Sequence, residues 1–445
     1  MNNQLLDPLA SFAGAHPELI AVVTANGESL SARQLDQAAS VAAARLQALG
    51  AGTGTVVALE GEPGLAWLAA LVGCWRLGAV AAPLNHRSTR IEGEQAARTL
   101  ACQLHCTPED DLLRQAANGH DFQAAPWTLE RPLLRVSTSG SSGEPRCVEL
   151  LASQLHFGAE ASRSRLGHDP HDRWLVCLPV NHVGALAAIY RCLHNQICLE
   201  LHTCFDVAVV ADRLDSGEVS LVSLVPSMLS DVLDHRGEQA FPKFLRVILL
   251  GGAPCSQSLL ERCRIARLPV SLSWGMTETA SQVATREPGD LSPLEDGLPP
   301  LPSVNVSVNE QGRLVVEGPI AAGRLVTDDL GEITAAGRVR VLGRSDEVII
   351  RGGENIQPGE IEHILSGHPG VTEVCVLPRT DPRLGQVPVA FIQGRDLDPR
   401  TLHNWCRERL AGFKIPEEFF CRAELPRTAA GKIDRQRLLA QLNDS

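Results

Sequence analysis

The chain has 445 residues, of which 44% are hydrophobic and 21% charged, and its formal net charge at pH 7 is -12. This composition is typical of a globular enzyme and excludes a disordered or fibrous chain. Because no dense stripe of Lys and Arg with interleaved aromatic residues is present, we expect neither nucleic acid nor an anionic membrane as a partner. The length exceeds that of one ordinary core and predicts two or more domains.

Residues 1–4 lack the basic patch and the long apolar core of a signal peptide, so we expect a cytoplasmic protein. The apolar stretch 65–75 is too short to span a bilayer and is followed by Arg76. It predicts a buried helix, and we expect no stable membrane insertion.

The 13 cysteines are odd in number and lack the regular spacing of a disulfide scaffold. They predict reduced thiols, as in cytoplasmic proteins. Cys102, His105 and Cys106 have metal-binding side chains, but no second cluster completes a zinc site. A structural metal is therefore the weaker interpretation.

The first half of the chain alternates helical and strand patterns. Residues 31–49 predict a helix with Ser31 or Ser29 as its N-cap, and residues 65–77 predict another. Short apolar runs predict buried strands at 55–59, 78–84, 173–178, 219–225 and 245–250. This alternation indicates an α/β architecture with largely parallel sheets.

The pattern changes after Gly297. Segments 304–308 and 313–317 alternate apolar and polar residues around a turn, as β-hairpins do. From about residue 346 the pattern becomes α+β. It predicts strands at 371–377 and 387–393, and helices at 358–365, at 402–410 and after Gly431.

The predicted fold begins with a large α/β N-terminal domain, residues 1–345, in which layered sheets with helices are joined to a β-rich subdomain. A small, mobile α+β C-terminal domain, residues 346–445, follows it. The boundary is expected at residues 343–346.

The first motif is Ser-Thr-Ser-Gly-Ser-Ser-Gly-Glu-Pro-Arg at 137–146, which follows an apolar lead-in at 133–136. Glycine lets the backbone approach an anion closely, and N–H and hydroxyl groups donate to phosphate oxygens. The Gly-Lys-Ser/Thr ending of a Walker loop is absent. Alone, the segment is equally consistent with a polar surface turn.

The second motif is Ser-Trp-Gly-Met-Thr-Glu-Thr at 273–279. A glycine beside an aromatic residue lets a flat base stack near the backbone. A carboxylate next to a hydroxyl can hold Mg²⁺ on a phosphate. Alone, this motif is also weak, because many Thr-Glu pairs simply begin a helix.

Read together and in order, segments 138–146, 274–278, 327–344 and 426–433 resemble the signatures of the adenylate-forming enzymes. These are the acyl-CoA synthetases, the adenylation domains of peptide synthetases and the luciferases. The resemblance runs from about residue 30 to the C-terminus. It implies the adenylate-forming enzyme fold, ATP and Mg²⁺ as cofactors, a small carboxylic acid as substrate, and CoA as the co-substrate that accepts the acyl group.

The resemblance implies a role for each residue that matches a motif. The residues that would surround the triphosphate are Thr138, Ser139, Gly140, Ser141, Ser142, Gly143 and Arg146. Those that would contact the adenosine are Gly251, Gly252, Ala253, Trp274 and Gly275 at the adenine and Asp329 and Arg344 at the ribose. Thr277 would contact the phosphate transferred as AMP, and Glu278 would hold Mg²⁺.

Lys432 would reach the reacting carboxylate and the α-phosphate. A carboxylate that attacks a phosphate brings two anions together, and a positioned ammonium with Mg²⁺ offsets that charge where little water is present. A lysine on a glycine-containing loop is a compact cation that can enter and leave a site. Without the other motifs, Lys432 would be interpreted as a solvated surface lysine.

Asp346 would be the hinge about which the small domain rotates after adenylation, which removes Lys432 from the site. Gly352 and Gly353 would then approach the thiol substrate. The alternative for these glycines is a β-turn that only connects a strand to a helix.

Two positions depart from the family pattern. The phosphate loop ends in Pro145-Arg146 where the family usually has Pro-Lys. The ribose motif reads Thr327-Asp328-Asp329 where the family usually has Thr-Gly-Asp, which adds a negative charge. Neither departure removes a group that the reaction needs, so activity is still expected.

Within the superfamily, segments 173–183, 249–253 and 352–362 most resemble the 2-succinylbenzoate–CoA ligases of menaquinone and phylloquinone biosynthesis. This resemblance implies an aromatic diacid as the substrate and places His182, Gly184 and Ser281 at the acyl pocket. His182 is equally consistent with a core histidine whose hydrogen bonds are made within the protein.

Two other functions stay open. One is a stand-alone enzyme that loads an aryl or acyl group onto a carrier protein in secondary metabolism and does not use free CoA. The other is a non-catalytic nucleotide-binding protein, against which the retention of Glu278, Asp329 and Lys432 argues. The sequence leaves the oligomeric state open, a homo-oligomer included.

Overall fold

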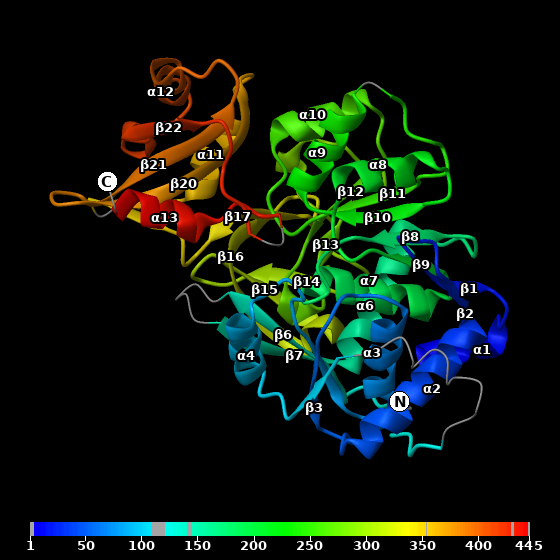
Figure 1. Ribbon diagram of the computed structural model, residues 1–445. Coiled ribbons are helices and arrows are strands. Elements are labelled where there is room, and N and C mark those ends of the chain that lie inside the picture. The colour runs from blue at the N-terminus through cyan, green and yellow to red at the C-terminus, as the bar shows by residue number, and fades with distance from the viewer. Residues whose placement is uncertain are drawn as a thin grey trace.

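The computed structural model describes residues 4–107, 121–139, 145–237, 239–352, 354–428 and 431–443. Its described residues before position 346 form three sheets, and a fourth sheet lies in the C-terminal part. In Figure 1 the C-terminal part, orange to red, lies beside the end of the larger part at which β16 (Gly323–Ile333) and β17 (Val339–Arg344) are found. The predicted layered α/β fold with a β-rich section and a small α+β C-terminal unit is confirmed.

The first sheet has eight strands in the order β13-β12-β11-β10-β8-β9-β1-β2. Only the β1–β2 and β12–β13 pairs are antiparallel. The strands are β1 (Ile20–Thr24), β2 (Ser29–Ser31), β8 (Arg173–Val176), β9 (Cys198–Leu201), β10 (Leu221–Leu224), β11 (Val247–Leu250), β12 (Val270–Trp274) and β13 (Ala284–Thr285). Alternate residues of the central strands enter two different apolar cores, so these strands are covered on both faces and are mostly apolar.

Helices cover both faces of this sheet. One core contains residues of α8 (Val207–Asp215), α9 (Pro226–Arg236) and α10 (Gln257–Ile265). The other core contains residues of α1 (Pro8–Ala15), α2 (Ala32–Ala48), α3 (Leu65–Leu77), α6 (Ala152–Leu166) and α7 (Val183–Asn195). This second core also receives side chains from the second sheet, so it joins the two sheets into one large unit.

The second sheet has the order β5-β3-β4-β6-β7. Its strands are β3 (Val56–Leu59), β4 (Val80–Pro83), β5 (Leu104–Cys106), β6 (Pro132–Ser139) and β7 (Pro145–Leu151), and α4 (Arg90–Thr99) lies between β4 and β5 in the chain. All 13 residues of α3 are buried, which confirms the predicted buried helix. Ser31 caps α2 through a capping box with Gln34, as predicted. Within the described ranges, no helix has the length and apolar character needed to cross a membrane.

The third sheet is an antiparallel meander in the order β14-β15-β16-β17. The predicted hairpin is confirmed as β14 (Asn305–Val308) and β15 (Arg313–Gly318). After β17, the chain enters the fourth sheet with β18 (Ile349–Arg351). The predicted domain boundary at residues 345 and 346 falls between β17 and β18 and stays a prediction.

The fourth sheet has the order β19-β18-β21-β20, and β22 pairs with β21. Its elements besides β18 are β19 (Glu354–Ile356), α11 (Pro358–Ser366), β20 (Val371–Asp381), β21 (Gly385–Gly394), α12 (Pro399–Arg407), β22 (Glu418–Arg422) and α13 (Arg435–Asn443). The helix predicted at 402–410 begins earlier, because Pro399 occupies its first turn and Asp398 caps it by accepting from the amide of Arg400.

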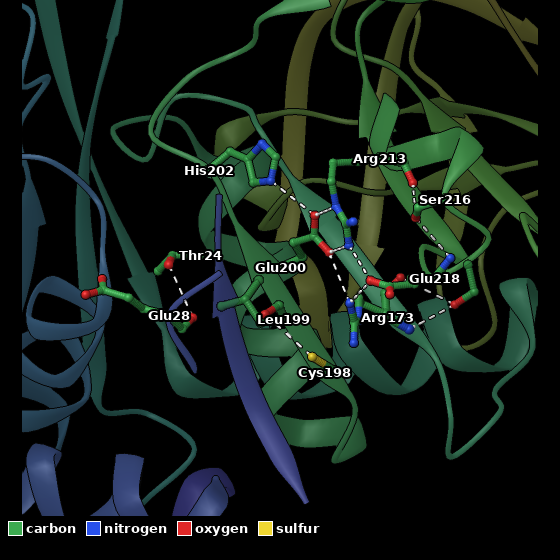
Figure 2. A network of polar contacts seen from close by, with 11 residues as sticks. Thr24, Glu28, Arg173, Cys198, Leu199, Glu200, His202, Arg213, Ser216 and Glu218 are labelled. Atoms are coloured by element: carbon green, nitrogen blue, oxygen red, sulfur yellow. Dashed lines mark hydrogen bonds and ion pairs between the residues drawn. The ribbon is translucent and has the colours of Figure 1, made fainter. Parts of the chain in front are cut away.

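A buried polar network connects β8, β9 and α8 (Figure 2). The side chain of Glu200 is 1% exposed, and it accepts hydrogen bonds from Nε and Nη2 of Arg213 at 2.7 and 2.9 Å. His202 Nε2 lies 3.1 Å from the same carboxylate, and Arg173 Nη1 lies 3.6 Å away. Burial alone would raise the pKa of Glu200, but its hydrogen bonds with Arg213 and His202 outweigh burial and lower the pKa to about 2. Glu200 is therefore a charged, paired group inside the fold.

All 13 cysteines have free thiols. His105 Nδ1 lies 2.6 Å from Glu60 Oε1, so the imidazole of the Cys102–Cys106 segment has a carboxylate partner. Within the described ranges, no group of three or more His, Cys, Asp or Glu side chains is arranged to hold a metal ion.

Candidate active site

The six parallel strands of the first sheet end at one edge. Four of them bear on the site, and three of these four lead into predicted site residues. β8 leads to His182, β11 to Gly251 and Gly252, and β12 ends at Trp274. The fourth, β10, leads into the first turn of α9. The carboxyl ends of neighbouring parallel strands meet at the same edge, where α/β proteins bind their ligands.

Lys432 of the C-terminal part reaches this edge. It lies in the segment between β22 and α13. This segment forms a loop, which is closed by a β-bridge between Arg427 and Ile433 and by a 2.8 Å hydrogen bond from the Thr428 amide to the Lys432 carbonyl. A β-carbon at Gly252 would lie 3.5 Å from Lys432 Cε and 4.0 Å from its Nζ. The structure therefore brings together the predicted lysine and the predicted glycine edge.

His182 and Arg344 complete the electrostatic surroundings of Lys432. Burial, helped by the Lys432 cation, lowers the pKa of His182 to about 4. His182 is therefore neutral at pH 7. Surrounding protein, together with the Arg344 cation, also lowers the pKa of Lys432, although its side chain keeps access to water.

Trp274, Asp329 and Arg344 form a connected group. Trp274 Nε1 donates to Asp329 Oδ2 at 2.7 Å, and Arg344 Nη1 lies 3.5 Å from Asp329 Oδ1. Asp329 and Arg344 face each other because they are paired residues of β16 and β17. Burial raises the pKa of Asp329, although the Trp274 hydrogen bond and the Arg344 cation oppose this rise.

The additional carboxylate at Asp328 has two cationic neighbours. Arg313 Nη1 lies 3.4 Å and Arg344 Nη2 3.5 Å from its oxygens. The negative charge that the sequence adds beside the predicted ribose site is therefore balanced by arginines of the same sheet.

Thr277 and Glu278 lie in a single 3₁₀ turn, Thr277–Thr279, and not in the first turn of an α-helix. Gly275 permits this turn, because a β-carbon there would fall 1.6 Å from the carbonyl oxygen of Ser281. Gln154 Nε2, at the start of α6, donates to the carbonyl of Glu278 at 2.7 Å and to that of Ile320 at 3.0 Å. The carboxylate of Glu278 itself is exposed.

The predicted phosphate loop connects two antiparallel strands, β6 and β7, in whose register Thr138 pairs with Arg146. Thr138 Oγ1 donates to the Arg146 carbonyl at 3.5 Å. The Thr277–Thr279 turn packs beside β7. Ser139 ends β6, and Gly140, Ser141, Ser142 and Gly143 lie outside the described residues.

The described residues fit a nucleotide with Mg²⁺. Gly251 leaves no room for a side chain, since a β-carbon there would meet the Ser273 carbonyl at 3.1 Å. The Gly251 backbone therefore lies close against β12, the strand that ends at Trp274. The exposed Glu278 carboxylate is a suitable ligand for a hard cation, and Lys432 supplies a positive charge for phosphate at the Gly252 edge.

Two of the predicted acyl-pocket residues, His182 and Gly184, lie at the start of α7. His182 is the N-cap of this helix, and Gly184 packs against Leu178, whose Cδ1 would be 3.2 Å from a β-carbon at that position. Among the described residues, the buried Oδ1 atom of Asn181 has no hydrogen-bond partner. Ser281 has a positive φ of 98° in the segment that approaches Gly275.

Arg191, also on α7, was not among the predicted site residues. It is 2% exposed, and its Nη1 and Nη2 have no hydrogen-bond partner within the described ranges. Its guanidinium carbon lies 5.8 Å from the centre of the Trp174 ring, and burial lowers the pKa of Arg191 to about 10. A lone arginine inside the apolar run 183–193 is the sequence signal that could have identified it.

Two further observations concern Gly352 and a pocket that lies outside the predicted site. Gly352 lies in the turn between β18 and β19, so this turn connects two strands and not a strand to a helix, and its role at the thiol stays a prediction; Gly353 lies outside the described residues. A pocket of about 540 Å³ lies between the third sheet and the C-terminal part, and it contains no predicted site residue. Its lining residues include Arg313, Leu330 and Gln357.

Comparison with known proteins gives two family matches. Residues 9–125 and 98–337 match the AMP-binding enzyme family, and residues 360–432 match the AMP-binding enzyme C-terminal domain. The 2-succinylbenzoate–CoA ligase of Listeria monocytogenes serotype 4b is 33% identical over 442 residues, covering 93% of this chain and 94% of that protein. The enzyme of the same name from Bacillus velezensis is 34% identical over 467 residues, covering 95% of each.

Solved structures agree with these matches. The o-succinylbenzoate CoA synthetase of Bacillus subtilis in complex with ATP and magnesium ion has a TM-score of 0.87 and 30% identity, over 98% of this chain and 100% of that one. The same enzyme in complex with its acyl-adenylate intermediate has a TM-score of 0.86 and 29% identity, over 98% of both chains. The chain therefore belongs to the AMP-binding enzyme family, the adenylate-forming enzymes that its ordered motifs resemble.

Proposed function

We propose that the chain is an ATP-dependent acid–CoA ligase that forms AMP and acts on 2-succinylbenzoate in the biosynthesis of menaquinone or phylloquinone. The observation that carries the chemistry is the position of Lys432, over Gly252 and near the neutral His182 and Arg344. This arrangement puts one cation at the edge where a nucleotide and a carboxylate would meet.

In the first step, a carboxylate oxygen of the acid attacks the α-phosphorus of ATP, and pyrophosphate leaves to give acyl-AMP. Lys432 offsets the negative charge that the two reacting anions bring together, and Thr277 contacts the phosphate that stays in AMP. Mg²⁺ on Glu278 would supply further charge stabilisation. Trp274 stands beside the adenine, and Asp329 and Arg344 hold the ribose hydroxyls.

In the second step, the thiol sulfur of CoA attacks the acyl carbon, the thiol proton is lost, and AMP leaves. We assign residues 346–445 as the domain that rotates about Asp346 between the steps. The rotation withdraws Lys432 and brings Gly352 and Gly353 toward the thiol. The two hydrogen bonds between Arg344 and Asp346 support a hinge that is linked to the nucleotide site.

The substrate assignment is supported by relatives named 2-succinylbenzoate–CoA ligase that align with more than nine tenths of this chain. Arg191 supports it independently. A buried guanidinium without an anionic partner is costly, and the second carboxylate of a diacid would supply that partner. His182, Gly184 and Ser281 would line the intervening part of the pocket.

The free thiols support a reducing compartment such as the cytoplasm, where ATP and CoA are present. CoA is the proposed acceptor because the relatives are named as CoA ligases. A carrier protein as acceptor is an outcome that the test below distinguishes.

The test measures pyrophosphate and acyl-CoA formation from ATP, Mg²⁺, CoA and 2-succinylbenzoate, beside a panel of aryl and fatty acids. The chain has three lysines, Lys243, Lys414 and Lys432, so Lys414→Ala is a matched control. Lys414 pairs with Glu360 at 2.7 Å within the C-terminal part. Turnover with 2-succinylbenzoate that Lys432→Ala abolishes and Lys414→Ala keeps is the expected result.

Pyrophosphate release with another acid only would contradict the substrate. Pyrophosphate release with 2-succinylbenzoate but no acyl-CoA would favour a carrier protein. No pyrophosphate release with any acid would contradict the proposed chemistry.

For the diacid pocket, Arg191→Met should raise KM for 2-succinylbenzoate roughly 10-fold or more, since a charge-assisted hydrogen bond is lost. An unchanged KM would remove Arg191 from the pocket.

A further inference from the structure

The carbonyl group directly before Lys432 accepts hydrogen bonds from both parts of the protein. Ser227 Oγ, in the first turn of α9, donates to the Gly431 carbonyl at 2.6 Å. Arg427 Nη1, in the lysine loop itself, donates to the same oxygen at 3.2 Å. This carbonyl and the Lys432 amide belong to one planar peptide unit, so the two bonds fix the orientation of the backbone from which Lys432 extends.

The backbone at Gly431 also lies directly on α9. A β-carbon there would meet Val225 Cγ2 at 3.2 Å, Met228 Cε at 3.3 Å and Ser227 Oγ at 3.5 Å. Gly431 has a φ of +77°, which glycine adopts without strain. The contact therefore combines a polar bond with close apolar packing at the start of one helix.

The two donors are held separately. Arg427 Nη2 lies 2.8 Å from Glu373 Oε2 of β20, so Arg427 belongs to the C-terminal part and would travel with it. Ser227 is 7% exposed and belongs to the larger part. The Ser227 bond is thus the one that depends on how the two parts are docked.

We propose that Ser227 is a positioning residue for adenylation, which holds the Lys432 loop at the nucleotide edge through its bond to the Gly431 carbonyl. The proposal rests on the proposed function and deepens it. When the C-terminal part rotates for thioester formation, the loop leaves α9 and this bond is broken. Ser227 therefore serves the first half-reaction and not the second.

The experiment separates the two half-reactions in Ser227→Ala. The first is measured as ATP–pyrophosphate exchange with 2-succinylbenzoate, and the second as CoA thioester formation from pre-formed acyl-adenylate. Loss of one neutral hydrogen bond should lower the exchange rate about 3- to 10-fold and leave the thioester rate and the KM for ATP near wild type. Ser230→Ala is the matched control, since Ser230 lies on the same helix and accepts from Arg262 Nη1 at 3.1 Å. It should leave both rates unchanged.

An exchange rate of Ser227→Ala equal to that of the wild type would overturn the proposal. Equal losses in both half-reactions would also overturn it, because they would indicate a general structural effect. These outcomes differ from failure of the proposed function, in which the wild-type enzyme itself would show no exchange with any acid.

Discussion

Asp346 binds the guanidinium of Arg344 through two hydrogen bonds, one from Nε to Oδ1 and one from Nη2 to Oδ2, each 2.9 Å long. Arg344 ends β17 and lies 3.5 Å from Asp329, while Asp346 lies in the segment that leads to the fourth sheet. The residue proposed to hold the ribose is therefore bound to the residue proposed as the hinge. A change at one should be measurable at the other.

Asp346→Asn tests this link. The substitution keeps the shape of the side chain but places an amide N–H group against Arg344, so the charge-assisted pair is lost. Because the pair is partly exposed, its loss is expected to cost about 1 kcal/mol, which corresponds to a rise of about 5-fold in the KM for ATP. Steady-state kinetics measure it, with the exposed Asp212 of α8 changed to Asn as the control. If Asp346→Asn and the control have the same KM for ATP, the proposed connection between Asp346 and the ribose site is contradicted.

Trp274→Phe removes only the ring N–H and keeps most of the aromatic surface. Asp329 then loses the 2.7 Å hydrogen bond that orients its carboxylate. We expect the KM for ATP to rise about 3- to 10-fold with little change in kcat. Trp405→Phe is the matched control, because Trp405 Nε1 donates to the Ile364 carbonyl within the C-terminal part. An effect of the same size in both variants would show that Trp274 has no special role.

The pH profile of adenylation should reflect two lowered pKa values. Burial and the Lys432 cation lower the pKa of His182 to about 4, so this residue stays neutral and adds no inflection near pH 6.5. The pKa of Lys432 lies below its usual value of 10.5, so the charged form is lost, and the rate falls, as pH rises through that lowered value.

Pyrophosphate exchange measured from pH 5 to pH 10 tests both statements. Lys432→Arg should move the alkaline fall to higher pH, because guanidinium stays charged. An acid inflection near pH 6.5 that disappears in His182→Asn would contradict the neutral state of His182.

Glu200→Gln should destabilise the fold at pH 7 by about 3–5 kcal/mol, because it leaves Arg213 and its neighbours without the buried carboxylate (Figure 2). The pKa of Glu200 falls from an ordinary 4.5 to about 2 on folding. Its contribution is therefore complete above pH 4.5 and is lost as pH falls through about 2. The difference in unfolding free energy between the wild type and the variant should shrink over that interval.

Urea unfolding at a series of pH values measures this difference. Glu218→Gln is the control, because Glu218 binds the same Arg213 at 2.8 Å but its side chain is 55% exposed. Its loss should cost no more than about 1 kcal/mol. Equal losses in the two variants would mean that burial of Glu200 does not matter.

The sequence predicts the fold well where apolar periodicity is strong. The runs at 55–59, 219–225 and 245–250 are confirmed as β3, β10 and β11, since strands covered on both faces are mostly apolar. β18, β19 and β22 were not predicted. β18 and β19 have three residues each and form a short local hairpin, and β18 and β22 are joined to the sheet by pairing with the distant strand β21.

Some residues of the candidate site could be predicted from the sequence and others could not. Ordered motifs identify Lys432, Trp274 and Asp329, and the structure brings these segments together, although their roles stay predictions. Gln154 and Ser227 could not be found, because each acts on a backbone carbonyl more than 100 residues away and no sequence pattern records such a partner.

The carboxamide of Gln154 joins three sheets. It lies just after β7 of the second sheet and donates to Glu278, which follows β12 of the first, and to Ile320, which precedes β16 of the third. The Thr277–Thr279 turn, which carries the proposed metal ligand Glu278, is thus hydrogen-bonded at the place where the three sheets meet. On heating, this turn should not loosen ahead of the layers themselves, so inactivation and loss of secondary structure should follow one common thermal transition.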